Sequence, residues 1–480
     1  VPLRASSCPS RHAYPFDQPI QSRQNNANRP AERQWRREPR ALPARSRPGF
    51  GGTVPRVNDE AAAPAAKAPT SSFLKLAGPG LVVAATGIGS GDVVSATVGG
   101  ARYGVVLLWA ILAGAFFKFV LSEGIARWQL ATGKTALEGW ADHLPPWVKW
   151  YFVTYLVIWT VAVTAALTNA TGLGIANLTG GRVSQSWGAV AHSLIGFAFV
   201  WLGGYGSFEK VMKILVGVMG FSILICAGLT LSDPGQAVQG LIIPTIPAGS
   251  GAYVLSLIGG VGGSVTILSY NYWMREEGMR GQGFLSYVRG DVAVAYVFTA
   301  LFGISIMLIA NDAFFVPGTA LRDAEAVPRM ADALGTALGP IGRFVFSAGF
   351  WAAVMASLLG VWQSIPYLYA DFYGILKRMS PQARLDVVKV TSTPYRLALA
   401  FVTLVPLPFA FTGRPIAVIV TYTIVGSLFV PFLAATLLYL NNKVAWTEPV
   451  PHNSVSTNVL LGAIVLLFVA IGGLEVVGLF

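Results

Sequence analysis

The sequence contains little cysteine, little histidine and little charge. Only two of its 480 residues are cysteines, Cys8 and Cys226, which excludes a framework of disulfides and a cysteine-based metal site. The four histidines lack the spacing of a zinc site; they are His12, His143, His192 and His452. Nucleotide-binding P-loops, nucleophile elbows and zinc-protease motifs are absent from the sequence. We therefore expect neither an enzyme nor an ATP-driven pump, and no cofactor.

Charged residues make up only 12% of the chain and hydrophobic residues 54%, with a mean hydropathy of +0.58. This composition is typical of an integral membrane protein. Apolar runs of roughly 18 or more residues predict membrane-spanning helices, and they are too long for barrel strands. We predict an all-α polytopic protein with eleven spans, at about 76–100, 104–130, 147–171, 187–204, 208–231, 251–274, 284–310, 336–361, 394–412, 415–440 and 455–478.

The excess of positive charge lies mainly at the start of the chain. Residues 1–70 contain eleven Arg and one Lys against five acidic residues, so they hold seven of the twelve excess charges. Residues 1–72 are also rich in proline and poor in apolar runs. This predicts a disordered tail that either belongs to the protein or precedes its true start. The net charge is therefore not a sign of nucleic-acid binding.

The charges of the connecting loops predict an orientation. The connections after the even-numbered spans carry more Lys and Arg than the opposite set. The positive-inside rule then predicts a cytoplasmic N-terminus and, with eleven spans, a C-terminus outside. We expect a multi-pass protein in the lipid bilayer of a bacterial-type cell membrane. Residues 73–445 would form a core of ten spans, and residues 446–480 the eleventh helix.

The first predicted span is interrupted by small and polar residues. It reads AATGIGSGDVVSATVGG over residues 84–100, with Gly89, Ser90 and Asp92 in the middle of an apolar run. A carboxylate in mid-membrane is costly, and a glycine-rich break leaves backbone groups without helical partners. Such a break is tolerated only where protein or a water-filled cavity covers it. Asp92 is therefore a candidate functional acid.

The sixth predicted span repeats this interruption. It reads LSLIGGVGGSVTILSYNYW over residues 255–273, and Gly262, Gly263 and Ser264 follow an earlier pair of glycines. Matched interruptions five spans apart predict a five-plus-five inverted repeat with broken helices 1 and 6 and a binding site at the breaks. Unwound carbonyls can bind a cation there, and half-helix N-termini an anion. Close helix packing is the alternative role of such glycines.

Asp92 has two interpretations that the residues leave open. It can be a ligand or proton carrier, with carbonyls of residues such as Thr86, Gly89 and Gly262 completing an oxygen shell. Alternatively, it holds helices together through Lys118, which lies near the centre of the second span and must find a partner or snorkel. Lys118 can instead pair with Glu123 or with a carbonyl.

Further polar residues carry weaker signals. Asn169 in the third span and Gln363 in the eighth are candidates for tuning or coupling, although interhelical hydrogen bonding is the ordinary role of such residues. Four charged residues flank the inner ends of spans 6 and 7, where interfacial charge is favoured over a gate; they are Arg275, Glu276, Glu277 and Asp291. The predicted binding residues are Asp92, Gly89, Ser90, Thr86, Gly262, Gly263 and Ser264, with Lys118, Asn169 and Gln363 as tuning or coupling residues.

Three stretches of the sequence carry a resemblance to a known family. They are GPGLVVAATGIGSGDVVSATVGGARYGVVLLWAILAG, LSEGIARWQLATGKTALE and VPFLAATLLYLNNK. Residues 73 to about 445 resemble the Nramp (natural resistance-associated macrophage protein) family of divalent metal transporters. The resemblance implies a LeuT/APC-like inverted-repeat fold and secondary-active transport.

The metal-site motifs depart from the family pattern. The family's Asp-Pro-Gly-Asn motif falls on residues 89–92, so Gly89 replaces the metal-binding Asp and Asp92 replaces the Asn. The family's Met-Pro-His motif falls on residues 263–265, which leaves no thioether and no imidazole. Carboxylate and carbonyl oxygens suit Mg²⁺, Ca²⁺ or Mn²⁺ rather than softer metals.

The resemblance implies transport of a divalent cation, with Mg²⁺ or Mn²⁺ favoured and protons as a candidate coupling ion. The alternative is an amino-acid or organic-anion transporter of the same fold. In that case the helix N-termini would bind the carboxylate, and Lys118 would take the place of a coupling cation.

Overall fold

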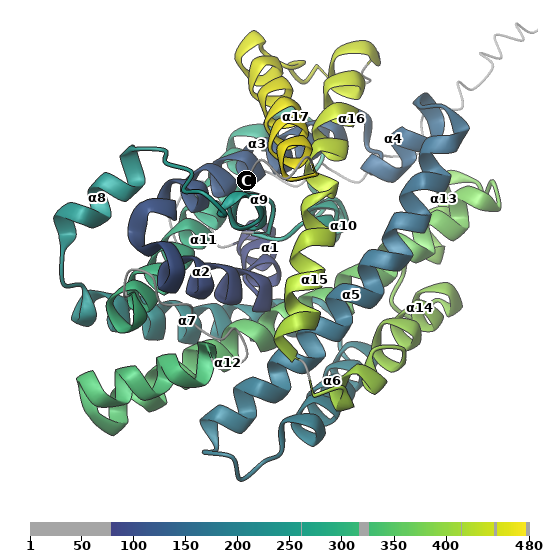
Figure 1. Ribbon diagram of the computed structural model, residues 1–480. Helices are drawn as coiled ribbons and strands as arrows, with labels where there is room; N and C mark the ends of the chain where they lie inside the picture. The colour runs from purple at the N-terminus through teal and green to yellow at the C-terminus, as the bar shows by residue number, and fades with distance from the viewer. Residues whose placement is uncertain (1–77, 261, 316–325, 414, 446–448, 477–480) are drawn as a thin grey trace, which may run out of the picture. The chain divides into compact units, whose positions relative to one another are not determined.

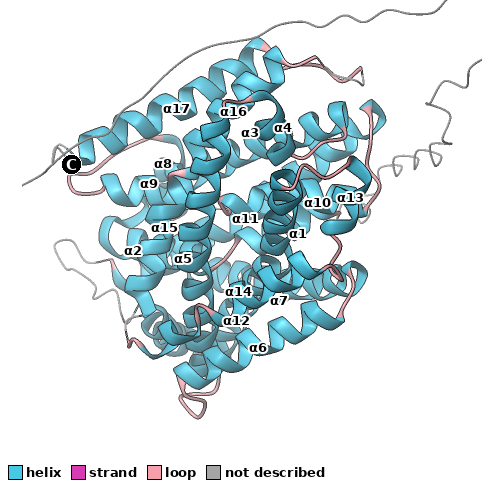
Figure 2. Ribbon diagram, turned by 90° about the vertical axis from the view of Figure 1, so that its right-hand side faces the viewer, coloured by secondary structure: helices cyan, strands magenta, loops and turns pink. Residues whose placement is uncertain are grey.

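The protein is represented by a computed structural model, which describes residues 78–260, 262–315, 326–413, 415–445 and 449–476. All of these residues belong to one unit, Ala62–Phe480. Within them the chain forms helices joined by loops, and Figure 2 shows no strand in this part. The tail predicted over residues 1–72 lies outside the described residues.

Figure 1 labels the helices along the chain. The first half contains α1 (Pro79–Gly87), α2 (Ser90–Tyr103), α3 (Leu108–Thr132), α4 (Ala136–His143), α5 (Pro146–Leu178), α6 (Gln185–Leu202), α7 (Tyr205–Thr230) and α8 (Pro234–Ile242). The second half contains α9 (Gly251–Gly260), α10 (Ser269–Glu276), α11 (Leu285–Phe314), α12 (Ala326–Leu376), α13 (Pro381–Val387), α14 (Thr393–Leu404), α15 (Pro415–Ser427), α16 (Phe429–Lys443) and α17 (Val455–Val476). Short 3₁₀ helices are η2 (Gly104–Leu107), η3 (Val265–Leu268), η4 (Gln282–Phe284) and η6 (Leu407–Phe411).

Eight helical stretches of the described residues are long and apolar enough to cross a membrane. They are Ser90–Thr132, Pro146–Leu178, Tyr205–Thr230, Gly251–Glu276, Gln282–Phe314, Val327–Leu376, Thr393–Phe411 and Thr421–Lys443, and a shorter apolar helix covers Val455–Ile471. The first stretch joins parts of two predicted spans. The prediction of a polytopic helical membrane protein is confirmed, whereas the count of eleven spans stays a prediction.

Helical structure stops at both glycine clusters. The first helix ends at Gly87 and the next begins at Ser90, while α9 ends at Gly260 and regular helix resumes through η3. Backbone hydrogen bonds lost at such breaks must be replaced by other partners inside a membrane. At the breaks, side chains therefore have to supply the hydrogen-bond partners that the backbone groups lack.

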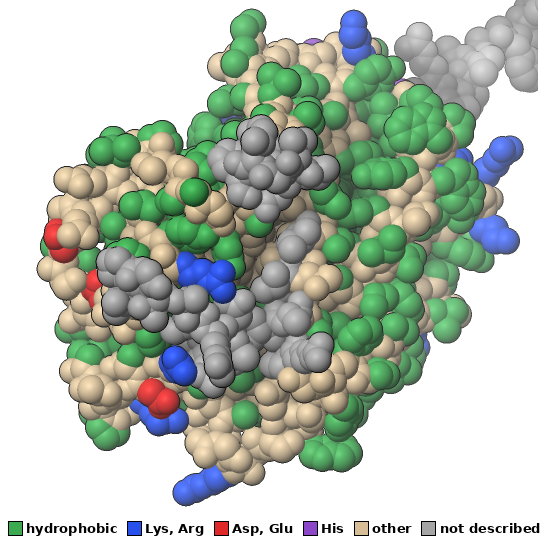
Figure 3. All heavy atoms as spheres, in the orientation of Figure 1, with side chains coloured by type: hydrophobic (Ala, Val, Ile, Leu, Met, Phe, Trp, Pro, Cys, Tyr) green, Lys and Arg blue, Asp and Glu red, His purple; other side chains and the backbone are tan. Residues whose placement is uncertain are grey.

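The broken helices lie within the packed bundle. Helix α1 packs against α7, α11 and α12, and α2 packs against α9, α11 and α15. Figure 1 shows α1, α2, α9 and α10 surrounded by other helices. On the face drawn in Figure 3, hydrophobic side chains are widespread and charged ones are few. Large exposed side chains such as Phe221 (70% exposed) fit contact with lipid.

Candidate functional site

Asp92 joins the two helix breaks. It lies in the first turn of α2 and is 4% exposed. Its Oδ2 accepts a hydrogen bond from the N–H of Gly89 at 3.0 Å, and its Oδ1 accepts one from the N–H of Gly262 at 2.9 Å. The first bond satisfies the N-terminus of α2, where the helix dipole favours a carboxylate. The second crosses to the other break, so a single side chain connects them.

Lys118 binds the second break with a positive charge, where Asp92 binds it with a negative one. Its side chain extends from α3 and is fully buried. The ammonium donates to the carbonyl oxygen of Gly259 at 2.8 Å and to that of Gly263. Of the partners that the sequence left open for Lys118, the structure shows carbonyl oxygens. Glu123 instead forms ion pairs with Arg127 and Arg289, both at 2.9 Å.

Glycine is required where the two breaks meet. A Cβ placed on Gly87 would lie 2.5 Å from the carbonyl carbon of Gly262, so the backbones pack directly on each other. Gly262 and Gly263 have φ angles of 77° and 84°, which only glycine adopts readily. The glycines therefore provide both the close packing and the unwound backbone that the sequence offered as alternatives.

The predicted hydroxyl residues have different surroundings. The Ser90 hydroxyl is buried and makes no hydrogen bond with the described residues. The Ser264 hydroxyl accepts a hydrogen bond from the indole N–H of Trp159 at 2.9 Å. The Thr86 carbonyl, which we expected to be a metal ligand, already accepts a hydrogen bond from Ser357 at 2.7 Å. Of these three groups, the Ser90 hydroxyl is the one without a hydrogen-bond partner among the described residues.

Asn169 and Gln363 have partners away from the breaks. The Asn169 amide donates to the carbonyl oxygens of Ala165 at 2.9 Å and Phe409 at 3.2 Å. The Gln363 side chain accepts from Trp273 at 2.8 Å and donates to Tyr367 at 3.0 Å. Both side chains make the interhelical or intrahelical hydrogen bonds that are usual in a helix bundle. None of these bonds is to Asp92, and the tuning or coupling role of the two residues stays a prediction.

Sequence reasoning missed two residues at the breaks. Ser357, on α12, binds the end of α1, and Trp159, on α5, binds the unwound segment. An indole N–H in the middle of an apolar span needs a partner, so Trp159 could have been found by that requirement. Ser357 carries no such signal, because small polar residues are common in membrane helices.

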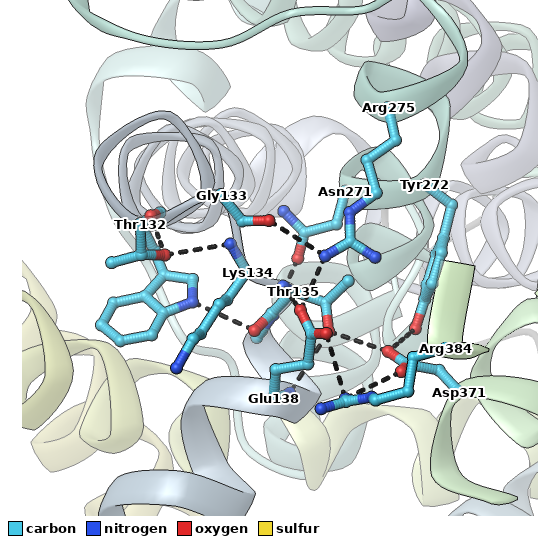
Figure 4. Close-up of polar contacts among 12 residues, drawn as sticks. Thr132, Gly133, Lys134, Thr135, Glu138, Asn271, Tyr272, Arg275, Asp371 and Arg384 are labelled. Carbon is cyan, nitrogen blue, oxygen red and sulfur yellow. Dashed lines mark hydrogen bonds and ion pairs between the residues drawn. The ribbon is translucent and has the colours of Figure 1, made fainter. Parts of the chain in front are cut away.

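A second polar cluster joins residues of α4, α10, α12 and α13 (Figure 4). Glu138 pairs with Arg275 of α10 at 2.6 Å and with Arg384 of α13 at 3.1 Å. Arg384 also pairs with Asp371 of α12 at 3.1 Å. These four residues, here called the Glu138 network, connect four helices through side chains alone.

Hydroxyl groups complete the Glu138 network. Asp371, whose side chain is 1% exposed, accepts hydrogen bonds from Thr135 and Tyr272, each at 2.8 Å. The other carboxylate, Glu138, caps α4 by accepting from the N–H of Thr135 at 2.5 Å. Buried charges persist only when they are paired and hydrogen-bonded in this way.

Asp291 corrects the expectation of ordinary interfacial charge. This carboxylate is fully buried near the start of α11. It accepts hydrogen bonds from the N–H groups of Gly78 at 3.2 Å and Gly80 at 2.7 Å, and from the Tyr270 hydroxyl at 2.9 Å. Asp291 therefore fixes the N-terminus of α1 to α10 and α11. The ion pair of Arg275 likewise places that residue in a network rather than at a simple interface.

The central site is poor in metal-binding side chains. Within the described ranges, no group of three or more His, Cys, Asp and Glu side chains could hold a metal ion. Asp92 is the acid at the breaks, so a cation there would depend on it and on backbone, hydroxyl or water oxygens. Such a donor set favours hard ions.

The membrane-spanning helices define an integral, multi-pass membrane protein. Residues 80–478 match the family described as "Natural resistance-associated macrophage protein-like", and the chain belongs to this Nramp family. The resemblance found in the sequence is thereby confirmed.

Curated relatives and solved structures agree with this assignment. The divalent metal cation transporter MntH of Klebsiella pneumoniae (strain 342) is 27% identical over 300 residues, which cover 60% of this chain and 71% of that protein. MntH of Chromohalobacter salexigens is 26% identical over 325 residues, covering 63% and 73%.

The structural likenesses concern the fold. A mutant of the Eremococcus coleocola manganese transporter matches with a TM-score of 0.65 and 16% identity, covering 85% of this chain and 88% of that one. MhsT in complex with L-phenylalanine matches with a TM-score of 0.57 and 16% identity, covering 86% and 99%. The chain therefore has a LeuT-like fold, which carries different substrates in different proteins.

Proposed function

We propose that the protein is a secondary-active transporter that moves a divalent metal cation through the space between the two helix breaks. The observation that carries this proposal is Asp92, a buried carboxylate that contacts both breaks. An acid inside a membrane bundle is expensive and usually serves an ion pathway. The names of the MntH relatives support a divalent metal as the substrate.

The chemistry of the site favours Mg²⁺ or Mn²⁺. Gly263, Ser264 and Val265 offer neither thioether nor imidazole, and Asp92 supplies a hard oxygen. With so few protein ligands, the cation would keep part of its water shell, which Mg²⁺ does readily. The buried Ser90 hydroxyl is placed to add one further oxygen or to hold such a water.

The Glu138 network is suited to closing the cytoplasmic side. It joins α10, the continuation of the second broken helix, to α12 and α13. In the proposed mechanism, one group of helices rocks against the other around the breaks, and these ion pairs separate when the inner side opens. The same proposal includes eleven spans, a five-plus-five inverted repeat and a cytoplasmic N-terminus.

A second candidate is transport of an amino acid or organic anion. The observation that favours it is the Lys118 ammonium, which already binds the carbonyls of Gly259 and Gly263. A break whose carbonyls hold a fixed cation has less need of a metal. The two candidate functions differ in the charge of the transported solute. Because the Asp92 carboxylate repels an anion and attracts a cation, a metal ion is the favoured substrate.

Uptake by the purified protein in proteoliposomes separates the candidates. We expect accumulation of Mn²⁺ or Mg²⁺ and no accumulation from a panel of amino acids. Repeating the assay with and without an inward pH gradient tests proton coupling. Uptake of an amino acid with no uptake of any divalent cation would refute the metal proposal and support the second candidate.

A further inference from the structure

We propose that Lys118 is a tethered cation that permanently fills a carbonyl site in the second break. This inference rests on the proposed transport function and deepens it. It assigns the carbonyls of Gly259 and Gly263 to the protein's own ammonium, and it leaves the Asp92 side of the break to the transported ion. The cycle would then need no free monovalent cation at this site.

The geometry of the second break resembles a site for a small cation. The Gly259 carbonyl belongs to the last turn of α9, where the helix dipole places partial negative charge. The Gly263 carbonyl lies within the break, and the Lys118 ammonium donates a hydrogen bond to each of these two carbonyl oxygens. Converging backbone carbonyls are the ligands with which channels replace the water of alkali cations.

These carbonyls need a hydrogen-bond donor or a cation because they lie inside the bundle. An unwound segment at membrane depth cannot use helical hydrogen bonds, and each unsatisfied group costs free energy. Gly259, Gly262 and Gly263 are buried among helices α3, α11 and α15. Lys118 supplies three N–H donors on a flexible stem that can reach them from α3.

The opposite side of the same segment carries the balancing charge. Asp92 accepts from the N–H of Gly262, one residue before the carbonyl that Lys118 binds. The peptide unit between Gly262 and Gly263 therefore lies between a carboxylate and an ammonium. Fixing both sides of the unwound segment would keep its shape when the substrate leaves, and it reserves Asp92 as the charged ligand for the substrate.

The test compares two variants of Lys118 that differ in how much space they leave beside the carbonyls of Gly259 and Gly263. Lys118→Ala removes the ammonium and its stem, so a free cation can enter. Lys118→Met keeps the stem but ends in a methyl group, which fills the space without charge. Both are compared with the wild type by thermal unfolding and by Mn²⁺ and Mg²⁺ uptake, in sodium, methylammonium or choline salts.

We expect the wild type to respond equally to all three salts. Lys118→Ala should lose at least about tenfold in uptake in choline, because a charge-assisted hydrogen bond is removed. Sodium or methylammonium should restore both its uptake and its unfolding temperature, whereas Lys118→Met should not respond. Lys213→Ala, which removes an exposed lysine from its ion pair with the partly buried Glu209, controls for general salt effects.

Several outcomes would overturn the proposal. One is a folded Lys118→Ala protein that is insensitive to the three salts in both assays. Another is a Lys118→Met protein that behaves as the wild type, or failure of both variants to fold in every salt. If the wild type transports no divalent cation but sodium or methylammonium still stabilises Lys118→Ala, the tethered-cation inference stands and the proposed metal function fails.

Discussion

The two polar regions of the bundle bind their charges in different ways. At the helix breaks, Asp92 and Lys118 bind backbone groups of the segment around Gly262. In the Glu138 network, carboxylates bind guanidinium groups of other helices. The first arrangement maintains an unwound backbone, and the second holds separate helices together.

This difference assigns separate roles to the two regions. Removing a charge at the breaks should change the binding of the ion, because the backbone and the carboxylate form the site. Removing a charge from the Glu138 network should change how often the inner side opens, because the network contributes no ligand to the breaks. The following predictions test this separation, from the largest expected effect to the smallest.

Asp92→Asn should have the largest effect on transport. The amide keeps one acceptor oxygen but places an N–H₂ group against the N–H of Gly89 or Gly262. Losing a charged hydrogen bond and the acid that joins the two breaks should lower Mn²⁺ and Mg²⁺ uptake by at least about tenfold. Initial rates in proteoliposomes measure this. Uptake equal to the wild type would remove Asp92 from the site.

Asp371→Asn should open the inner side. It leaves Arg384 and two hydroxyl donors facing a neutral amide, and breaking a buried ion pair is strongly destabilising. The reporter is Ser364→Cys in a background without Cys8 and Cys226, because Ser364 is buried about two helical turns from Asp371. A small thiol reagent should label this cysteine at least about tenfold faster in Asp371→Asn protein. An unchanged labelling rate would show that the network is no gate.

Gly87→Ala should disrupt the contact between the breaks. The added methyl group would lie 2.5 Å from the carbonyl carbon of Gly262, so one backbone must move. Overpacking of this kind costs about 1–3 kcal/mol, which should lower the unfolding temperature and the uptake rate together. The matched control is Gly217→Ala on α7, where the methyl group meets no atom within 4 Å. Equal effects of the two substitutions would mean that the breaks do not pack as described.

Asp142→Asn should have the smallest effect. Its ion pair with Lys134 at 2.8 Å lies near the Glu138 network but is exposed, with side chains 39% and 48% accessible. Exposed pairs contribute less than about 1 kcal/mol, so stability, uptake and labelling of the reporter cysteine should stay close to wild type. Faster labelling here would indicate that any charge change at this end opens the protein.

The sequence predicted the breaks but not all of their partners. Glycine clusters at matched positions of two apolar spans, one of them beside a carboxylate, favoured unwound backbone over close packing alone. The bond between Asp92 and Gly262 depends on how two helices meet, and hydropathy carries no such information. For the same reason, the partner of Lys118 stayed open until the structure showed carbonyls.

The sequence did not predict the partners in the Glu138 network, although a gate was the less favoured alternative for Arg275. The members of the network lie between positions 138 and 384, and each resembles an ordinary charge near a helix end. Asp291 was misjudged for the same reason, since its burial follows from the packing of α1 against α10 and α11. Hydropathy does not determine the number of spans, because short, broken or polar helices have lengths close to the minimum that is needed to cross a membrane.

Direct binding of Mn²⁺ and Mg²⁺ to the purified protein tests the central claim most directly. Calorimetric titration should give saturable binding to the wild type, an affinity at least about tenfold weaker for Asp92→Asn, and an unchanged affinity for Asp371→Asn. Equal binding by the wild type and Asp92→Asn, or an equal loss in both variants, would contradict the separation between an ion site at the breaks and a gate at the Glu138 network.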